Sequence, residues 1–565
     1  MFAFPNPRTK DPSERRKQRI LEVIPGILTW VTLIGMFLFS FSVPIYVAYF
    51  IITFDIYWIL RTIFIAYYSV DGYRKLRDGK KIDWWERCQN ISNPRNYLEI
   101  IKERILQIEG SLKNRGGMKR RDVKILKEEL KRQKKYLQEV KEVEKISGSV
   151  LDWREIVHVV MLPTAGEPAG VIEPSITAIK EANFPNEQII ILLATEERED
   201  AEHRKQKVEY LKNKFAGVFR EFIVTTHRVK DDEMKTKAAN ASFAARELVE
   251  YLKEKNIDFR RVIFSNFDCD SVAHKEYFAA LTYEYIIDPK RLQRSYQPLP
   301  MYHNNLWDTN AFVRVIVTGS SFWHIFQSTR LDGMVTFSSH SEPFDTLYNV
   351  DFWPVNMISE DSIIYWKCFT YYNGDYRVKP IYLPISLDAV LADTYWKTIV
   401  NQYKQKRRWA YGIENFPVIM RAIGPNKKIS FRQKFKTAFE MLEGHHSWAT
   451  SALILAVLGW LPLIFGGDEF NQQVIAHNLP IYTRYLMTLA MLGLAVSMSL
   501  SFLLLPPRPA KYSRWRNMYM LLQWILVPII APFLGSFPAI DSQTRIMLGK
   551  YFGEFWVTPK KSVKK

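Results

Sequence analysis

Two long apolar regions, one near each end of the chain, restrict the folds that this sequence can adopt. The first runs from about Val23 to Val70, which is far longer than the core of a signal peptide and lacks a small-residue cleavage site. Because about 20 apolar residues span a bilayer, it predicts two transmembrane helices, roughly 22–42 and 45–69, with a turn near Pro44. Asp55 and Arg61 fall inside the second helix. Ionisable groups are costly in lipid, so we expect both to face protein or a pore.

The second apolar region predicts two more spans, 448–465 and 481–505, after an amphipathic helix at 432–446 that would lie on the cytosolic face. The loop between these spans contains no Lys or Arg, whereas basic clusters follow residue 70 and occupy 506–517. By the positive-inside rule the clusters are cytosolic and the loop is external. Residues 518–535 are long enough to span, but two prolines and a basic tail favour an interfacial or re-entrant segment. The prediction is four spans, in the plasma or inner membrane, with both termini cytosolic.

Charge and cysteine content exclude some classes of protein. The chain of 565 residues carries 78 Lys and Arg against 59 Asp and Glu, a net charge of +19. No nucleic-acid-binding motif accompanies this excess, and much of it flanks apolar runs, so we expect a lipid bilayer and no nucleic acid as partner. The three cysteines offer no disulfide framework and no zinc spacing.

Between the apolar regions the chain alternates strand-like and helical stretches, which predicts an α/β domain with a mixed, mainly parallel sheet at 153–428. Residues 94–147 are charged and carry apolar positions at helical spacing, which predicts an antiparallel helical hairpin. A solvated insertion is the favoured interpretation of this hairpin, and a lipid-surface or oligomer contact is the alternative.

The stretch VIFSNFDCDS, residues 262–271, is a short apolar strand that ends in two carboxylates, Asp268 and Asp270. Active sites of α/β domains open at the carboxyl ends of such strands. With no basic residue between them, the two carboxylates repel each other unless a cation joins them. A hard divalent ion that also binds substrate phosphates meets that need. A solvated loop is the alternative for an isolated motif of this kind.

Two later stretches favour the functional interpretation: Ser359-Glu360-Asp361 and the run QKRRW at 405–409. In this order the three motifs resemble those of membrane-bound family 2 glycosyltransferases, the group of the cellulose, chitin and hyaluronan synthases. The resemblance covers roughly residues 155–420. The tail FWVTPK also resembles the family's gating segment. An ordinary basic interfacial helix is the alternative for QKRRW alone.

The resemblance implies a GT-A-like catalytic domain and a role for each matching residue. Asp361 would be the catalytic base, and Asp268 and Asp270 would hold Mg²⁺ or Mn²⁺. The expected nucleotide-sugar-binding residues are Thr164, Glu167, Lys237, Asn240, Arg408, Thr558 and Lys560. The expected acceptor-binding residues are Glu360, Gln405, Trp409, Gly319 and Ser320. Glu360 would raise the proton affinity of Asp361 by like-charge repulsion, and a solvated helix-start lysine is the alternative for Lys237.

The sequence departs from the family in the second strand, 189–200, where Ala194, Thr195, Glu196 and Glu197 stand in place of an aspartate pair. That departure leaves the nucleotide base open, with a UDP-sugar the favoured donor. The expected domains are a basic cytosolic N-terminus (1–21), two transmembrane helices (22–70), the hairpin (94–147), the catalytic domain (153–428), an interfacial helix with two spans (429–505), and a re-entrant segment with the gating-like tail (506–565).

The expected activity is inverting transfer of a sugar from a nucleotide diphosphate sugar to a growing polysaccharide, with coupled translocation. Transfer of one sugar to a polyprenyl phosphate or other lipid acceptor is the alternative, and a catalytically inactive scaffold is a third. Four spans are few for a polymer channel, so an oligomer or partner subunit is expected to complete a pore.

Overall fold

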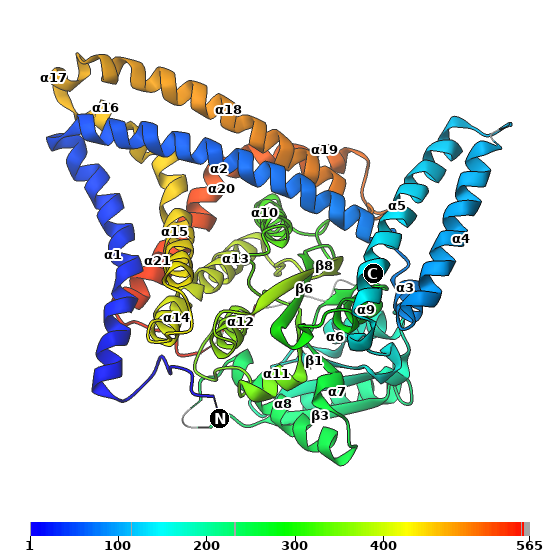
Figure 1. The fold of residues 1–565 in the computed structure, drawn as a ribbon. Helices are drawn as coiled ribbons and strands as arrows, with labels where there is room; N and C mark the ends of the chain where they lie inside the picture. Colours follow the sequence, from blue (N-terminus) through cyan, green and yellow to red (C-terminus); the bar gives the residue numbers. More distant parts are fainter. Residues whose placement is uncertain (1, 115, 231–232, 555, 559–565) are drawn as a thin grey trace.

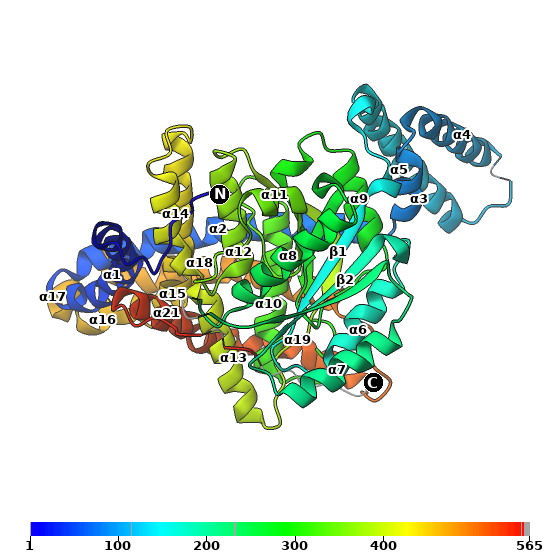
Figure 2. The ribbon, with the colours of Figure 1, turned by 90° about the horizontal axis from the view of Figure 1, so that it is seen from below.

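A sheet domain carries long apolar helices along one side and a helical hairpin at one edge (Figure 1). The computed structural model describes residues 2–114, 116–230, 233–554 and 556–558. Figure 2 shows α1 and the hairpin at opposite ends of the molecule, with the sheet domain between them.

The sheet has eight strands in the order β3-β2-β1-β4-β7-β6-β8-β5. The pairs β3-β2, β2-β1, β1-β4 and β6-β8 are parallel, and β4-β7, β7-β6 and β8-β5 are antiparallel. The strand bounds are β1 Val157–Pro163, β2 Ile189–Glu196, β3 Glu221–His227, β4 Val262–Asn266, β5 Val272–Ala273, β6 Arg294–Met301, β7 His340–Pro343 and β8 Arg377–Ser386. The predicted fold class, a mixed, mainly parallel sheet domain between apolar helices, is confirmed.

The central strands are buried on both faces, which is why β1, β2 and β4 read as continuous apolar runs. Alternate residues of β1 and β2 enter two cores, one under α6 and α9 and the other under α8 and α12. The helices of this domain are α6 Ala169–Lys180, α7 Ala201–Lys214, α8 Lys237–Glu254, α9 Tyr277–Ile286, α10 Ala311–Ser328, α11 Phe344–Asn349, α12 Glu360–Tyr371, α13 Tyr395–Ala410 and α14 Asn415–Ile423.

The N-terminal apolar region forms two helices that break at Val43, as the sequence predicts, although both extend further than the expected spans. They are α1 Pro12–Ser42 and α2 Pro44–Gly79. Asp55 is buried and accepts a hydrogen bond from Thr483 (3.2 Å), and Arg61 pairs with Glu443. Asp55 and Arg61 therefore both face protein.

The second apolar region differs in detail from the prediction. The expected interfacial helix and the start of the next span form one helix, α15 Phe431–Ala456, which bends by 51° into the segment Leu458–Phe465. The bend follows Val457, whose backbone leaves the helical conformation, and the segment beyond it contains α16 Leu461–Phe465. After α17 Gly467–Asn471, the helix α18 Val474–Leu504 starts earlier than expected and packs along α2 (Figure 1).

Among the described residues four helices are long and apolar enough to cross a membrane, or five if the bent pair counts as one span. The four are Pro12–Ser42, Pro44–Gly79, Val474–Leu504 and Trp515–Met547. The last includes the segment expected to be re-entrant, and it consists of α19 Trp515–Leu522, a 3₁₀ turn Gln523–Leu526, α20 Val527–Ile530, a π-helical turn Ala531–Ser536 and α21 Phe537–Met547.

Both ends of the segment 515–547 lie against the sheet domain. Before it, Lys511 and Tyr512 bind Asp308 at 2.6 and 2.7 Å. After it, Glu554 forms a β-bridge with Lys235. A segment whose two ends contact the same sheet domain returns to the side it left, which supports the re-entrant interpretation despite its length.

The hairpin consists of α4 Pro94–Lys113 and α5 Arg120–Lys145, and α3 Trp84–Ile91 connects it to the end of α2. Its base joins the core of the sheet domain through Ile101 and Val140. The hairpin that the sequence predicts at 94–147 is therefore present in the structure.

Candidate active site

The two aspartates of the DCD motif follow β4 at the carboxyl edge of the sheet. Asp268 accepts hydrogen bonds from Lys237 Nζ (2.8 Å) and from Ser338 Oγ (2.5 Å). Asp270 is buried, and its Oδ2 accepts from the backbone N–H of Asp388 (2.9 Å). Both aspartates line one cavity of about 1150 Å³.

Lys237 joins the first acidic motif to the second. It is the first residue of α8, whose cap Thr236 accepts a hydrogen bond from the N–H of Ala239. Besides Asp268, its Nζ lies 3.3 Å from Asp361 Oδ1 and 3.4 Å from Glu360 Oε1. Burial opposes the charged form, but these three carboxylates outweigh it and raise the pKa of Lys237. Lys237 is thus a buried cation at the centre of the site and not a solvated helix-start lysine.

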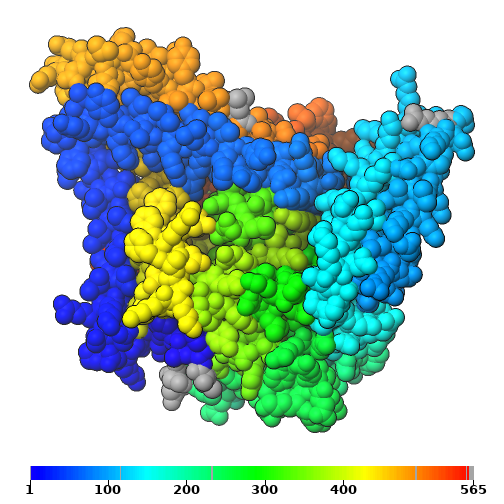
Figure 3. Space-filling view, in the orientation of Figure 1, coloured from blue at the N-terminus to red at the C-terminus, as the bar shows by residue number. Residues whose placement is uncertain are grey.

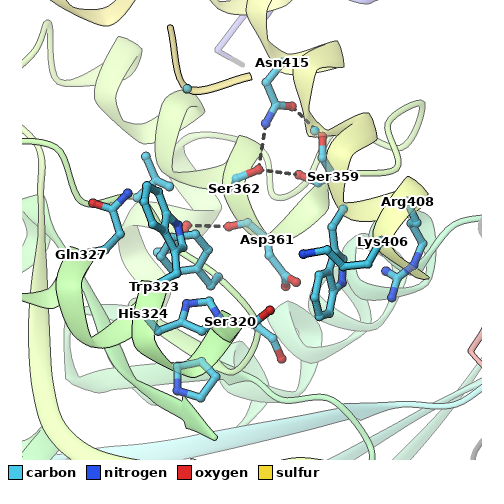
Figure 4. A pocket seen from close by; sticks show the side chains of 18 of the residues that line it. Ser320, Trp323, His324, Gln327, Ser359, Asp361, Ser362, Lys406, Arg408 and Asn415 are labelled. Atoms are coloured by element: carbon cyan, nitrogen blue, oxygen red, sulfur yellow. Dashed lines mark hydrogen bonds between the residues drawn. The ribbon is translucent and has the colours of Figure 1, made fainter. Parts of the chain in front are cut away.

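Glu360 and Asp361 occupy the first turn of α12, where the positive end of the helix dipole favours carboxylates. The start of this helix is fixed by Glu414, which accepts from the N–H groups of Ile358 (2.7 Å) and Ser359 (2.8 Å). Figure 4 shows the Asp361 carboxylate pointing into the cavity, between Ser320 and Lys406.

The two carboxyl groups of this motif differ in environment. Glu360 is 3% exposed, and burial, followed by the charge of Asp361, raises its pKa to about 8. Its carboxyl therefore keeps a proton to a higher pH than an exposed glutamate does.

Behind Asp361 lies the imidazole of His340, a residue of β7. Its Nδ1 is 2.7 Å from the carbonyl oxygen of Phe337 and 3.7 Å from Asp361 Oδ1. Burial lowers the pKa of His340. A proton on Nδ1 would donate to the carbonyl oxygen of Phe337, and burial favours the neutral ring.

The loop after β1 holds Thr164 and Glu167, which line the same cavity. Thr164 donates to Glu167 Oε2 (3.0 Å), which also accepts from the N–H of Ala165 (2.8 Å). A buried lysine, Lys207 of α7, donates to Thr164 Oγ1 (2.9 Å) and to Glu199 (2.6 Å). This network gives the loop a fixed shape at the cavity wall.

Asn240 lines the cavity, but its Nδ2 donates to the carbonyl oxygen of Ala194 (2.9 Å) at the end of β2. The observed contact ties α8 to the sheet. Beside it, Glu196 pairs with Arg198, and both line the cavity where the sequence departs from the family's aspartate pair.

The QKRRW run forms the end of α13. Gln405, Arg408 and Trp409 all line the cavity. Gln405 is buried and accepts from Gln402 Nε2 (3.1 Å), and the ring of Trp409 lies 6.1 Å from that of Tyr302. Lys406 Nζ lies over Trp409 (5.0 Å) and Trp448 (4.7 Å), and burial lowers the pKa of Lys406 to about 8.

Gly319 and Ser320 line the cavity from a helix, α10, and not from the loop that the sequence comparison predicts at 317–326. The apolar positions of 311–328 continue through this stretch, so a buried helix forms despite its small residues. No atom lies within 4 Å of a Cβ placed on Gly319, so this wall is open. His324 of the same helix packs its ring 4.6 Å from that of Phe337.

The C-terminal tail reaches the same cavity. Val557 and Thr558 line it, and the Thr558 hydroxyl is buried without a hydrogen-bond partner among the described residues. Before them, the ring of Phe552 packs 4.4 Å from that of Tyr411. Lys560, the last residue of the predicted gating motif, lies outside the described residues.

A divalent ion fits the donor set of the DCD motif. The described residues contain no group of three or more His, Cys, Asp or Glu side chains that could hold a metal by themselves. Two carboxylates facing a cavity suit Mg²⁺ or Mn²⁺, because such ions commonly take one or two carboxylates and complete their coordination with substrate phosphates and water. Asp268 and Asp270 provide that pair.

No family model matches this chain, and no curated protein matches its sequence. Among solved structures, the mannosyltransferase PcManGT from Pyrobaculum calidifontis, in complex with GDP-Man and Mn²⁺, is 16% identical. The match covers 60% of this chain and 86% of that one, with a TM-score of 0.37. TarS from S. aureus is 11% identical, with coverage of 64% and 56% and a TM-score of 0.30. GalNAc-T7, in complex with UDP, GalNAc and Mn²⁺, is 11% identical, with coverage of 52% and 58% and a TM-score of 0.31.

The chain thus spans little more than half the length of the latter two proteins. Similarity at this level does not assign an activity, so the activity has to be inferred from the site itself.

Several residues of the site were not predicted from the sequence: Arg198, Lys207, Ser338, His340, Asp388 and Lys406. Asp388 follows β8 as Asp268 follows β4, so the rule of acidic residues after apolar strands could have found it. Ser338 and His340 belong to a segment without a recognisable motif. Lys207 resembles any solvated lysine of a charged helix.

Proposed function

We propose that this chain is a membrane-embedded glycosyltransferase that transfers a sugar, with inversion, from a nucleotide diphosphate sugar to a growing glycan. The observation that carries this proposal is the convergence on Lys237 Nζ of Asp268, Asp361 and Glu360, at 2.8, 3.3 and 3.4 Å. Acidic motifs 90 residues apart in the chain thereby share one cavity with Arg408 and Trp409.

The donor diphosphate fits beside Asp268 and Asp270. Lys237 and Arg408 are cations at this part of the cavity, and a divalent ion on the two aspartates would act there as a Lewis acid toward the leaving diphosphate. The base and ribose would lie toward Thr164, Glu167 and Glu196, and the tail residue Thr558 adds a hydroxyl to the same cavity.

We infer that Asp361 acts as the base, because its carboxylate points into the cavity. An acceptor hydroxyl gives its proton to Asp361, its oxygen forms the new bond to the anomeric carbon, and the bond to the diphosphate oxygen breaks with its electron pair on the leaving group. One base opposite one leaving group requires inversion. Trp409 offers an aromatic face for the acceptor sugar, beside the open wall at Gly319.

The shape of the cavity supports a glycan product directed toward the bilayer. From the acidic centre the cavity extends to Trp58 of α2, Trp448 of α15 and Trp524 before α20. Aromatic residues on three apolar segments give a lining on which sugar rings can stack. We further propose the plasma or inner membrane as its location, and a second copy or partner subunit as the source of the remaining channel wall.

A lipid phosphate acceptor is the second candidate, and one observation favours it. Arg432 and Lys436 of α15 line the cavity, while Phe431, Phe435 and Phe439 of the same helix are exposed. A helix with an apolar outer face and cations at a cavity mouth suits a phosphate headgroup at the bilayer surface.

Purified protein in lipid nanodiscs, supplied with a panel of radiolabelled nucleotide sugars and Mg²⁺ or Mn²⁺, tests the proposal. A product that remains at the origin of a thin-layer plate and is cut by a glycosidase supports polymer synthesis. A product that moves with lipid-linked monosaccharides supports the second candidate. If folded protein transfers no sugar from any donor, polymer synthesis and lipid-linked transfer are both contradicted. The inactive scaffold is then the interpretation that remains.

A further inference from the structure

The far end of the α4–α5 hairpin is separate from the catalytic machinery. The hairpin is held at its base, where Arg87 pairs with Glu139 (2.6 Å) and Arg132 donates to the carbonyl oxygen of Lys81 (3.1 Å). Its far end, here called the hairpin tip, comprises the described residues 113–114 and 116–127. The tip stands clear of the sheet domain in Figures 1 and 3.

Charge is segregated along this hairpin. The stem residues 94–112 and 128–145 carry nearly balanced charges, and ion pairs such as Lys134–Glu109 (2.7 Å) and Arg95–Glu144 (3.4 Å) join its arms. In the tip, one acidic residue, Asp122, accompanies six basic residues: Lys113, Lys119, Arg120, Arg121, Lys124 and Lys127.

All six basic residues of the tip are exposed. Within the part of the chain that the structure describes, none of them forms an ion pair with a carboxylate. A solvated stem needs no such excess at one end, and six like charges repel one another. An anionic partner at the tip would remove that repulsion.

The tip also exposes apolar side chains among its cations. Ile125 is 53% exposed, Met118 is 39% exposed, and Leu106, just below the tip on α4, is 67% exposed. Cations interleaved with apolar groups suit the boundary between lipid headgroups and acyl chains. They suit a nucleic acid less well, and no aromatic residue lies in the tip to stack on bases.

The direction of the hairpin decides which anionic partner it meets. In Figure 1 the tip rises toward the side of the molecule occupied by α2 and α18, the apolar helices that pack together. Figure 3 shows it reaching the level of that apolar layer. A basic cluster lies in the sequence between the apolar part of α2 and the hairpin: Arg74, Lys75, Arg77, Lys80 and Lys81. This cluster marks the expected cytosolic surface of the bilayer.

We propose that the hairpin tip binds the anionic headgroups of the cytosolic leaflet and so fixes the sheet domain against the membrane at a second point. The inference depends on the membrane embedding of the apolar helices and not on the proposed activity. It replaces the solvated insertion that the sequence favours.

The test uses the full-length protein in nanodiscs made of zwitterionic lipid, with or without phosphatidylglycerol. Met118→Cys carries an environment-sensitive fluorophore, and a lipid with a nitroxide on its headgroup serves as quencher. The native cysteines Cys88, Cys269 and Cys368 are buried, so the label goes to the introduced thiol. Lys141→Cys, an exposed position near the base of α5, is the matched reporter away from the tip.

We expect quenching at Met118→Cys to rise at least about twofold when phosphatidylglycerol is added, because each cation near an anionic leaflet favours contact. Added salt should reverse the rise. The change Lys119→Gln, Arg120→Gln, Arg121→Gln and Lys124→Gln should abolish it. The matched change Lys131→Gln, Lys134→Gln, Lys135→Gln and Lys141→Gln removes as many charges from the stem and should preserve it.

Equal quenching with and without the anionic lipid would overturn the proposal, and so would equal loss in the tip and stem variants. If quenching depends on the number of protein copies per nanodisc and not on the lipid composition, the lipid proposal is wrong. The tip would then mediate self-association. Each variant is checked for retention of its secondary structure by circular dichroism before its quenching is compared.

Discussion

At the residue scale, the site depends on the contacts of the Lys237 ammonium group with the acidic side chains around it. Lys237 lies against three carboxylates in a buried place, where an unpaired charge is far more costly than a paired one. Ser338 and Asp388 N–H add hydrogen bonds to the two aspartates of the DCD motif. The donor would therefore enter a site whose charges are already positioned, and a metal with its diphosphate would rebalance the Lys237 contacts.

Asp270→Asn should abolish sugar transfer and metal binding that depends on the donor. The amide keeps the shape of Asp270 and its acceptor for the Asp388 N–H, but it removes the anionic ligand. We expect a loss of at least about 10²-fold, since even groups behind metal ligands are worth 10–100-fold. Manganese binding followed by electron paramagnetic resonance, with and without donor, measures the effect. Full transfer by wild-type protein in EDTA would contradict the metal role.

Glu360→Gln tests the protonation of the second motif. Because the pKa of Glu360 is raised to about 8, its carboxyl ionises as the pH passes that value and adds a charge beside Asp361. We expect wild-type transfer to fall above about pH 8 and the variant, which keeps a neutral side chain, to lack that limb. Rates measured from about pH 6 to about pH 9, a range that brackets this pKa, check the prediction.

The same shift predicts a sign for stability. Between the ordinary pKa of 4.5 and about 8, the folded chain holds a proton on Glu360 that the unfolded chain releases. Wild-type stability should therefore fall as the pH rises through this range, relative to Glu360→Gln. Parallel melting curves of the two proteins that do not diverge with pH would show that Glu360 is already ionised.

At the element scale, the position of the tail depends on its contacts with α1. Tyr551 OH accepts from Arg15 Nη2 (2.6 Å) and Arg19 Nη1 (2.9 Å), and Arg8 lies 3.9 Å from its ring centre. These contacts hold the chain that leads to Thr558 in the cavity.

Tyr551→Ala should loosen the tail and raise the KM for the donor several-fold, with a smaller effect on kcat. Three arginines, Arg8, Arg15 and Arg19, lie 3.9, 5.3 and 6.0 Å from the ring centre. Each cation–π contact is worth about 0.5–2 kcal/mol. Tyr551→Phe keeps the ring and loses only the hydroxyl contacts, so it should lie between Tyr551→Ala and the wild type. Equal KM values in all three proteins would separate the tail from donor binding.

Sequence patterns predicted some elements better than others. The strand before Asp268, the break at Val43 and the hairpin at 94–147 were predicted because apolar runs and helical spacing are local signals. The helix at 311–328 and the bend after Val457 were not predicted. Small residues in α10 suggested a loop, and in α15 the apolar pattern changes without a break in the helix.

The candidate site shows the same division. The motifs predicted Asp268, Asp361 and Trp409 as cavity residues, because their spacing is distinctive. The protonation of Glu360 could not be predicted, since it follows from burial against elements that are distant in the chain. The role of Ser338 as a hydrogen-bond donor to Asp268 could not be predicted either, because it depends on the fold of a loop that carries no recognisable motif.

At the scale of the whole molecule, the apolar helices form two hairpins that return to the sheet domain. α1–α2 turns at Val43, and the segment from α15 to α18 turns near α17. Both turns lie at the same corner of the molecule in Figure 1, away from the acidic centre. This arrangement supports the topology that we propose, with the turns outside, the sheet domain in the cytosol and 515–547 re-entrant.

A cysteine at Gln472 should therefore react with an impermeant thiol reagent added to intact cells, and one at Lys550 should be protected. Both positions are exposed on the protein surface. A difference in their reactivity would therefore show that they lie on opposite sides of the bilayer. Permeabilised cells, in which both should react, provide the control. Labelling at Lys550 in intact cells would make 515–547 a full span.

The central claim is that the acidic motifs around Lys237 form one site for sugar transfer, in which Asp361 takes the acceptor proton. Asp361→Asn tests it most directly, because the amide keeps the shape but cannot act as a base. Calorimetric donor affinity should stay near that of the wild type, while turnover falls by roughly 10²–10⁴. Undiminished turnover, or a loss of affinity as large as the loss of turnover, would contradict the account.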